Sequence, residues 1–371
     1  MKKCIYSKKT ESEAKFDSGE HVFPAAIGGI ACLPNEYVSA ETNNEFSKIE
    51  LHFAREYPPI MISRMFLSHT GRKKHKNRDR IVALRSESDN EMALGYIREG
   101  KPCLINQMIF SDSGQELKIK IDSHINKNIE NTCVQFIEKL KTYDSSPVII
   151  RNDEIDKTTY LLGVNDERWY LGINSDKDED ESMRIMLKMI SQITEDLFSV
   201  KSQTGNICNV EASINVAIDL EYVYRVLAKI AFNSLAYLKG QDYVLKSEFD
   251  GIREAILTGK NIYSYFPPQK PDCTLPLGQN ILKNVIDLGE NYHFVAFINL
   301  QNKLVALLSL YGSSQIYLIQ FSSCYDEQLF DMFVCDWENK KEYSLRDISN
   351  ILSEQINDNF NSIFSKGLFS K

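Results

Sequence analysis

Residues 20–50 read EHVFPAAIGGIACLPNEYVSAETNNEFSKIE, and the predicted fold of the N-terminal part rests on this stretch. Glu20 and His21 precede a short apolar run that a proline ends, which is typical of a strand entering a turn. Side chains alternate along a strand, so the two can serve one site only where the strand twists or ends. Gly28 and Gly29 permit a tight bend. A helical face follows, formed by Phe46, Ile49 and Phe53.

The order of these residues resembles the HNH endonuclease family. The resemblance is to the variety with an acid-His-hydrophobic-hydrophobic-Pro opening, a Gly-Gly, and a Val-Cys-x-x-Cys-Asn-Asn close, and it covers roughly the first fifth of the chain. It implies a two-stranded ribbon plus a helix, the ββα-metal fold, which holds one divalent cation and hydrolyses phosphodiester bonds. We therefore expect an N-terminal HNH-like domain in an α+β protein.

The resemblance also implies a role for four residues of this chain. Glu20 and Asn43 correspond to the metal ligands, and Asn44 is an alternative to Asn43. His21 corresponds to the general base, and Asn35 to the residue that orients the histidine. Two oxygen ligands leave most of the coordination sphere of Mg²⁺ or Mn²⁺ to water and phosphate. A histidine with an ordinary pKa near ~6.5 can accept a proton from water at neutral pH.

The chain departs from the family pattern at the zinc knuckle. Family members carry Cys-x-x-Cys twice, whereas this chain has Cys4 with Ser7 and Ser39 with Thr42 at those positions. One cysteine cannot hold a tetrahedral zinc ion. We therefore expect no structural zinc, and a ribbon held together by packing.

Three hypotheses follow for the function. The first is a Mg²⁺- or Mn²⁺-dependent DNA endonuclease whose later domains control targeting or activation, as in bacterial or phage DNA restriction and defence. The second is a catalytically decayed HNH-fold protein that binds or senses DNA. The third is a protein-interaction module in which the basic run only keeps the fold soluble. Each motif residue also has a structural interpretation of its own, because a Glu-His pair is common and Asn43-Asn44 before an amphipathic run resembles a helix N-cap.

Charge is distributed unevenly along the chain. Residues 1–80 contain 14 Lys and Arg against 10 Asp and Glu, a net charge of +4, whereas the whole chain carries -8 and the remainder therefore -12. A basic run gives salt-dependent affinity for polyanions, although a solvated loop has the same composition. The residues predicted to contact nucleic acid are Arg64, Arg72, Lys73, Lys74, Lys76 and Arg78.

The composition predicts a soluble globular protein. The 371 residues are 43% hydrophobic and 25% charged, and no run approaches the ~18 apolar residues that a membrane span requires. No apolar core of signal-peptide length follows the first residues, so we expect a cytoplasmic protein without a membrane partner. The eight cysteines are scattered, which favours reduced thiols.

The remaining sequence predicts two further α+β domains. Residues 1–82 would form the HNH-like domain with its basic tail, 83–205 a middle domain of strands and two helices, and 206–371 a domain with a long helix and a β-meander. The last two would bind a regulatory partner or a second copy of the chain. His293 starts a strongly apolar strand, so it is expected to be a hydrogen-bonded core residue rather than a ligand.

Overall fold

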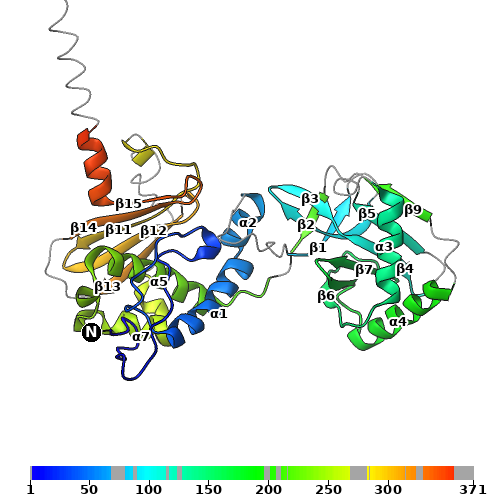
Figure 1. Cartoon of the computed structure of the whole chain (residues 1–371), viewed down its shortest axis with the longest axis horizontal. Coiled ribbons are helices and arrows are strands. Elements are labelled where there is room, and N and C mark those ends of the chain that lie inside the picture. The colour runs from blue at the N-terminus through cyan, green and yellow to red at the C-terminus, as the bar shows by residue number, and fades with distance from the viewer. Residues whose placement is uncertain are drawn as a thin grey trace, which may run out of the picture. The chain divides into compact units, whose positions relative to one another are not determined.

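The computed structural model shows a mixed α+β protein with two compact units (Figure 1). The first unit comprises Met1–Arg64, His69–Lys73 and Ile218–Lys371, and the second comprises Met65–Ser68 and Lys74–Ala217. The structure describes residues 2–67, 80–86, 90–113, 117–122, 128–195, 201–205, 210–214, 216–267, 282–283, 285–313, 315–322 and 329–354. None of the described helices combines the length and the apolarity that crossing a bilayer requires.

An antiparallel sheet forms the centre of the first unit (Figure 1). Its strand order is β13-β12-β11-β14-β15, with bounds Ile316–Ser322, Lys303–Ser309, His293–Leu300, Phe330–Asp336 and Lys341–Ser344. One face carries Phe294, Val305 and Val334 and packs against residues of 282–288 and of the helix at 345–354. Phe321 on the other face stacks on Phe232 of the long helix α5 (Leu220–Lys239). The sheet is therefore covered by helical layers on both faces.

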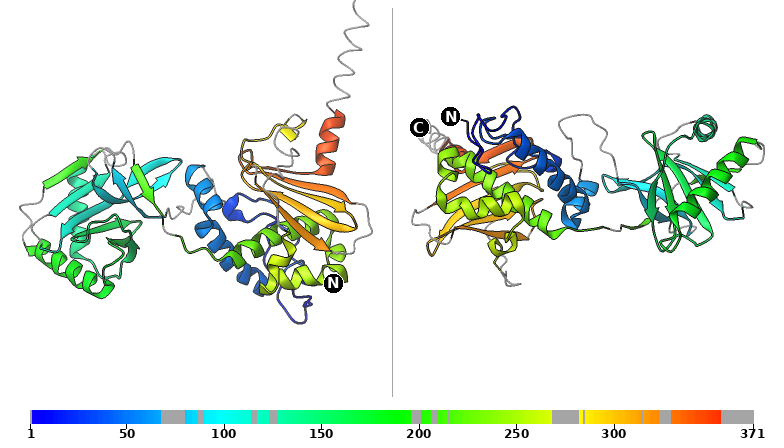
Figure 2. Two further views of the ribbon diagram at one scale, coloured as in Figure 1. Left: turned by 180° about the vertical axis from the view of Figure 1, so that it is seen from behind. Right: turned by 90° about the horizontal axis from the view of Figure 1, so that it is seen from below.

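The long helix α5 is defined by signals at both of its ends. The side chain of Asp219 caps its N-terminus by accepting hydrogen bonds from the backbone N–H groups of Glu221 and Tyr222. Gly240, at φ +87°, ends it. Residues 226–236 are all buried, because the helix lies between the sheet and α1 (Ala40–Glu56), as Figure 2 also shows. Helices α6 (Gln241–Val244) and α7 (Asp250–Thr258) complete this layer.

The described residues 80–214 of the second unit form two sheets and two helices. The smaller sheet has the order β10-β1-β2-β3, with bounds Val210–Ser213, Val82–Ser86, Met92–Arg98 and Lys101–Leu104. The larger sheet has the order β6-β8-β7-β4-β5-β9, with bounds Val148–Arg151, Arg168–Ile173, Thr159–Asn165, Asn106–Ser111, Leu117–Asp122 and Lys201–Gly205. Helices α3 (Ile129–Lys141) and α4 (Glu179–Glu195) cover one face of the larger sheet through an apolar core. The smaller sheet packs on the opposite face.

The two units differ from the three domains predicted by the sequence. The predicted boundaries near 82 and 205 lie close to the ends of the second unit, but the segments on either side of it belong to one unit. Contacts of α5 with the N-terminal segment join them, and such contacts between residues more than 200 positions apart leave no periodic signal. The predicted meander is confirmed as β11, β12 and β13, and β14 and β15 extend it beyond the predicted strands.

His293 at the start of β11 is fully buried and hydrogen-bonded through both ring nitrogens. Its Nε2 lies 2.9 Å from the carbonyl oxygen of Ile27, and its Nδ1 accepts a hydrogen bond from the N–H of Tyr311 at 2.8 Å. The accepting Nδ1 assigns the neutral tautomer with its proton on Nε2. Burial lowers the pKa of His293 to about 4, and the bond to Ile27 offsets a small part of that effect. The expected core histidine is confirmed.

The depressed pKa of His293 predicts acid sensitivity. The unfolded chain takes up a proton on this residue below about pH 6.5, whereas the folded chain does so only near pH 4, so stability falls as the pH drops through this interval. Between pH 7 and pH 5 the loss should be about 2 kcal/mol. Urea denaturation at pH 7 and at pH 5 should show a smaller loss of stability for His293→Gln than for the wild type. An equal pH slope for wild type and His293→Gln would contradict this assignment.

Candidate functional site

The N-terminal motif forms a short hairpin-like loop followed by α1. The N–H of Leu33 donates to the carbonyl oxygen of Glu20 at 2.7 Å, and the N–H of Val22 donates to that of Ala31 at 2.9 Å. His21 and Cys32 form an isolated antiparallel bridge between these two bonds. The described residues form one isolated bridge here in place of the two strands that the resemblance implies, so the ββα element remains a prediction.

The two glycines of the motif are required by close contacts. Gly28 has φ +98°, and a Cβ atom there would lie 2.5 Å from the Cβ of Trp337. A Cβ atom on Gly29 would lie 1.9 Å from the carbonyl oxygen of Phe23. The carboxylate of Glu342 on β15 then accepts hydrogen bonds from the N–H groups at positions 30 and 31, at 3.0 and 2.6 Å. The turn is thus anchored to the sheet of the first unit.

The carboxylate of Glu20 is buried and bound by a lysine of α5. Lys229 is 0% exposed, and its ammonium donates to Glu20 and to Glu50 of α1, the latter at 2.5 Å. Asn233, one helical turn further along α5, donates from its amide to the Glu20 carboxylate at 3.2 Å and to the carbonyl oxygen of His21 at 2.9 Å. The hydroxyl of Tyr6 donates to the amide oxygen of Asn233 at 2.5 Å. We call these five residues, Tyr6, Glu20, Glu50, Lys229 and Asn233, the buried polar network.

Two carboxylates share one ammonium in this network. Burial raises the pKa of Glu20, and Glu50 raises it further, while Lys229 and Asn233 partly offset both effects. Burial opposes the charge on Lys229, but the attraction of the two carboxylates exceeds it and raises the pKa of the lysine. The ammonium therefore stays charged between the two carboxyl groups.

The other predicted site residues lie around this network without joining it. Asn43 in α1 donates from its amide to the hydroxyl of Ser18 at 3.0 Å, which brings it near the start of the motif. His21 is partly buried, and Asn35 is exposed with its amide oxygen beside Gly19. Asn44 is exposed on α1.

Metal binding by Glu20 and Asn43 remains a prediction. A cation on the Glu20 oxygen that faces α5 would have to displace the ammonium of Lys229. Among the described residues, no group of three or more His, Cys, Asp and Glu is placed to hold a metal ion. In this arrangement the Glu20 carboxylate fits a structural ion pair better than a Mg²⁺ site.

The four zinc-knuckle positions come together in the fold. Ser39 caps α1, and its hydroxyl donates to that of Thr42 at 2.9 Å. The thiol of Cys4 donates to the hydroxyl of Thr42 at 3.7 Å, and Ser7 hydrogen-bonds the same sulfur. Burial would raise the pKa of Cys4, but hydrogen bonds from Ser7 and nearby backbone groups hold it below its usual range. Hydrogen bonds thus connect the positions at which the resemblance predicts thiolates.

The predicted nucleic-acid contacts have only one described member. The guanidinium of Arg64 is partly buried and donates to the carbonyl oxygen of Ala54 at 2.9 Å, and burial lowers its pKa. That bond holds α2 (Pro58–Phe66) against the end of α1. The basic residues Arg72, Lys73, Lys74, Lys76 and Arg78 lie outside the described residues.

Comparisons with protein-family models, curated proteins and solved structures found no match to this chain. The site therefore has to be interpreted from its own residues.

Sequence reasoning missed the partners of Glu20, although α5 contains a signal for them. Lys229 and Asn233 are polar residues four positions apart within an otherwise apolar helical run, so they share one buried face.

Removal of the buried ammonium should destabilise the first unit strongly. Lys229→Met leaves two carboxylates without a cation, which costs about 3–5 kcal/mol in the free energy of unfolding. The further change Glu20→Gln should recover part of this loss, because it removes one of the unpaired charges. Lys239→Met, the same substitution at the exposed end of α5, should stay within about 0.5 kcal/mol of wild type. Urea titration of the four proteins checks this, and full stability of Lys229→Met would refute the role of the network.

Proposed function

We propose that the chain is a nucleic-acid-binding or nucleic-acid-sensing protein built on an HNH-like element whose acidic residue has a structural role. The observation that carries the proposal is the pairing of Glu20 with Lys229, which takes up the carboxylate that would otherwise ligate a catalytic cation. A buried lysine bonded to the predicted metal ligand favours a folding role over hydrolysis.

The arrangement of the knuckle positions supports the HNH-like element itself. Cys4, Ser39 and Thr42 are buried in one hydrogen-bonded cluster, and α1 begins directly after Ser39. Spacing alone could arise by chance, but spacing together with convergence in space supports a common origin with zinc-knuckle nucleases. The net charge of +4 over residues 1–80 supports a polyanionic partner.

The endonuclease is the second candidate, and one observation favours it. His21 is partly exposed, and the amide nitrogen of Asn43 donates to Ser18, two residues before Glu20, so the predicted second ligand contacts the segment that leads into the Glu20-His21 pair. In this candidate Lys229 would release Glu20 when metal and DNA bind, and His21 would take the proton from the attacking water.

Plasmid incubation and salt titration separate the two candidates. We expect salt-dependent DNA binding and no cleavage with Mg²⁺ or Mn²⁺. Cleavage that chelator and His21→Ala both abolish would establish the endonuclease instead. The triple variant with Lys73→Gln, Lys74→Gln and Lys76→Gln should bind DNA with a weaker salt dependence. The slope of log affinity against log salt should fall by roughly 0.9 for each phosphate that these lysines neutralise in the wild type. The matched triple change of exposed lysines 101, 139 and 141 to Gln should leave the slope unchanged.

Restoration of the missing thiols tests the HNH-like geometry independently of activity. The variant with Ser7→Cys, Ser39→Cys and Thr42→Cys presents four sulfur ligands with Cys4, and it should bind one Zn²⁺ per chain and gain thermal stability. A control with Ser12→Cys, Ser47→Cys and Ser63→Cys adds the same number of thiols at scattered positions. Elemental analysis and the absorption of the Co²⁺ derivative measure binding. Zinc content no higher than in the control would show that these positions do not form a knuckle.

A further inference from the structure

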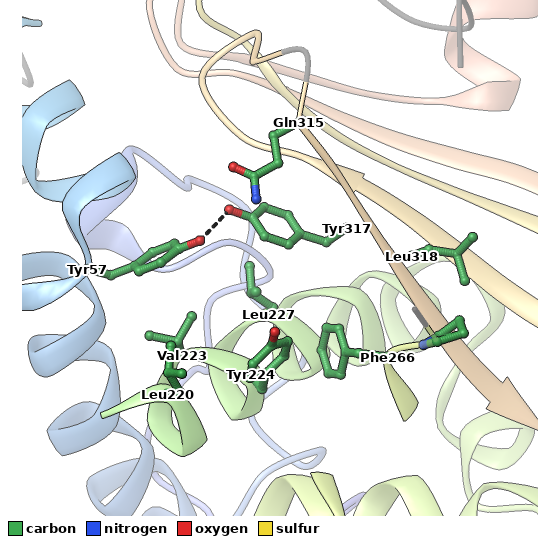
Figure 3. A pocket seen from close by; sticks show the side chains of 10 residues that line it. Tyr57, Leu220, Val223, Tyr224, Leu227, Phe266, Gln315, Tyr317 and Leu318 are labelled. Atoms are coloured by element: carbon green, nitrogen blue, oxygen red, sulfur yellow. Dashed lines mark hydrogen bonds between the residues drawn. The ribbon is translucent and has the colours of Figure 1, made fainter. Parts of the chain in front are cut away.

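A cavity of about 220 Å³ lies in the first unit between four segments that are distant in sequence (Figure 3). Its lining comes from the residue that ends α1, the first two turns of α5, the residues after the 3₁₀ helix η3 (Ile262–Tyr265), and the start of β13. The ten lining residues are Tyr57, Leu220, Val223, Tyr224, Leu227, Phe266, Pro267, Gln315, Tyr317 and Leu318. The volume is several times the roughly 30 Å³ share of a water molecule, yet below the range for drug-sized ligands. It is therefore suited to a compound of one ring system.

The hydrogen-bonding groups of this cavity gather at one end. The hydroxyls of Tyr57 and Tyr317 are 2.8 Å apart and hydrogen-bonded to each other, as the dashed line in Figure 3 shows. The side chain of Gln315 reaches the same place and bonds to Tyr57. Burial raises the pKa of both tyrosines, so their hydroxyls stay protonated at neutral pH and can donate as well as accept. This end presents donors and acceptors together.

Aromatic rings and apolar side chains form the rest of the wall. The rings of Tyr224 and Phe266 are 4.4 Å apart in an edge-to-face arrangement, and Tyr263 packs against Tyr224 from outside. Leu220 is 52% exposed at the mouth, so apolar surface is available to an incoming ligand. The ten lining residues that the structure describes include no Asp, Glu, Lys, Arg or His. A ligand matched to this wall is flat, neutral and apolar on its faces.

We propose that this aromatic pocket binds one nucleobase, with its ring against Tyr224 and Phe266 and its hydrogen-bonding edge toward Gln315, Tyr57 and Tyr317. Nucleobases are neutral planar rings whose edges carry donors and acceptors, and proteins bind them by stacking on aromatic side chains and by amide hydrogen bonds. The base could belong to a free nucleoside or to an unpaired position in a nucleic acid, and in the second case the pocket deepens the proposed function.

Equilibrium dialysis with adenosine, guanosine, cytidine and uridine tests the pocket on the full chain. We expect saturable binding of at least one nucleoside with a Kd of about 1 mM or tighter, and a weakening of about tenfold in Tyr224→Ala. Tyr237→Ala is the matched control, because Tyr237 is also a partly exposed tyrosine of α5 but does not line the pocket. Gln315→Ala changes an exposed residue and should alter the preference among the four nucleosides without affecting folding.

A second arm identifies the source of the base. If single-stranded but not duplex oligonucleotides displace the bound nucleoside, and Tyr224→Ala abolishes oligonucleotide binding, the ligand is an unpaired base of nucleic acid. If nucleosides bind and oligonucleotides do not, the ligand is a free nucleoside. The pocket proposal is overturned if no nucleoside or single strand binds saturably, or if Tyr224→Ala and Gln315→Ala both bind like wild type. The plasmid and salt experiments test His21 and the basic lysines, not the pocket. A negative result for the pocket therefore does not change the interpretation of those experiments.

Discussion

The first unit depends on a lysine ammonium buried away from water. Desolvation of Lys229 carries a large cost, which the two carboxylates of Glu20 and Glu50 offset only because all three groups are held in hydrogen-bonding geometry. Each partner comes from a different segment: the N-terminal loop, α1 and α5. Any arrangement that separates these segments leaves an unpaired charge in the core. The main effect of the network is therefore to determine that the N-terminal loop, α1 and α5 pack together. Its contribution to the net free energy of folding is smaller.

Contacts with three parts of the first unit hold the N-terminal loop in place. The loop is held at the sheet by Glu342, at α5 by Asn233, and at the start of α1 by the Ser39 and Thr42 hydroxyls. A small element with a thin core usually needs such external support.

The two proposals concern different regions of the first unit, one polar and one aromatic. In the polar region the resemblance predicts a hydrolytic site, but the Glu20 carboxylate is bound by Lys229, which favours the proposal of binding over that of cleavage. The aromatic pocket uses different segments and a different chemistry, namely ring surfaces and neutral hydrogen bonds. Both regions suit nucleic acid or its components, the first through charge and the second through bases.

Local elements and one motif of this protein follow from its amino-acid order alone. The stop at Gly240 and the apolar runs within residues 293–322 each depend on neighbours in the chain, so the end of α5 and the meander were predictable. The Gly-Gly turn and the order of Glu20, His21 and Asn43 were visible for the same reason. Only the tertiary structure shows that the segments before and after the second unit form one unit. Only the tertiary structure shows that Lys229 contacts Glu20, 209 positions away, and that Tyr57 contacts Tyr317, 260 positions away. These pairings depend on burial and charge compensation in space, which a single sequence does not encode as a pattern.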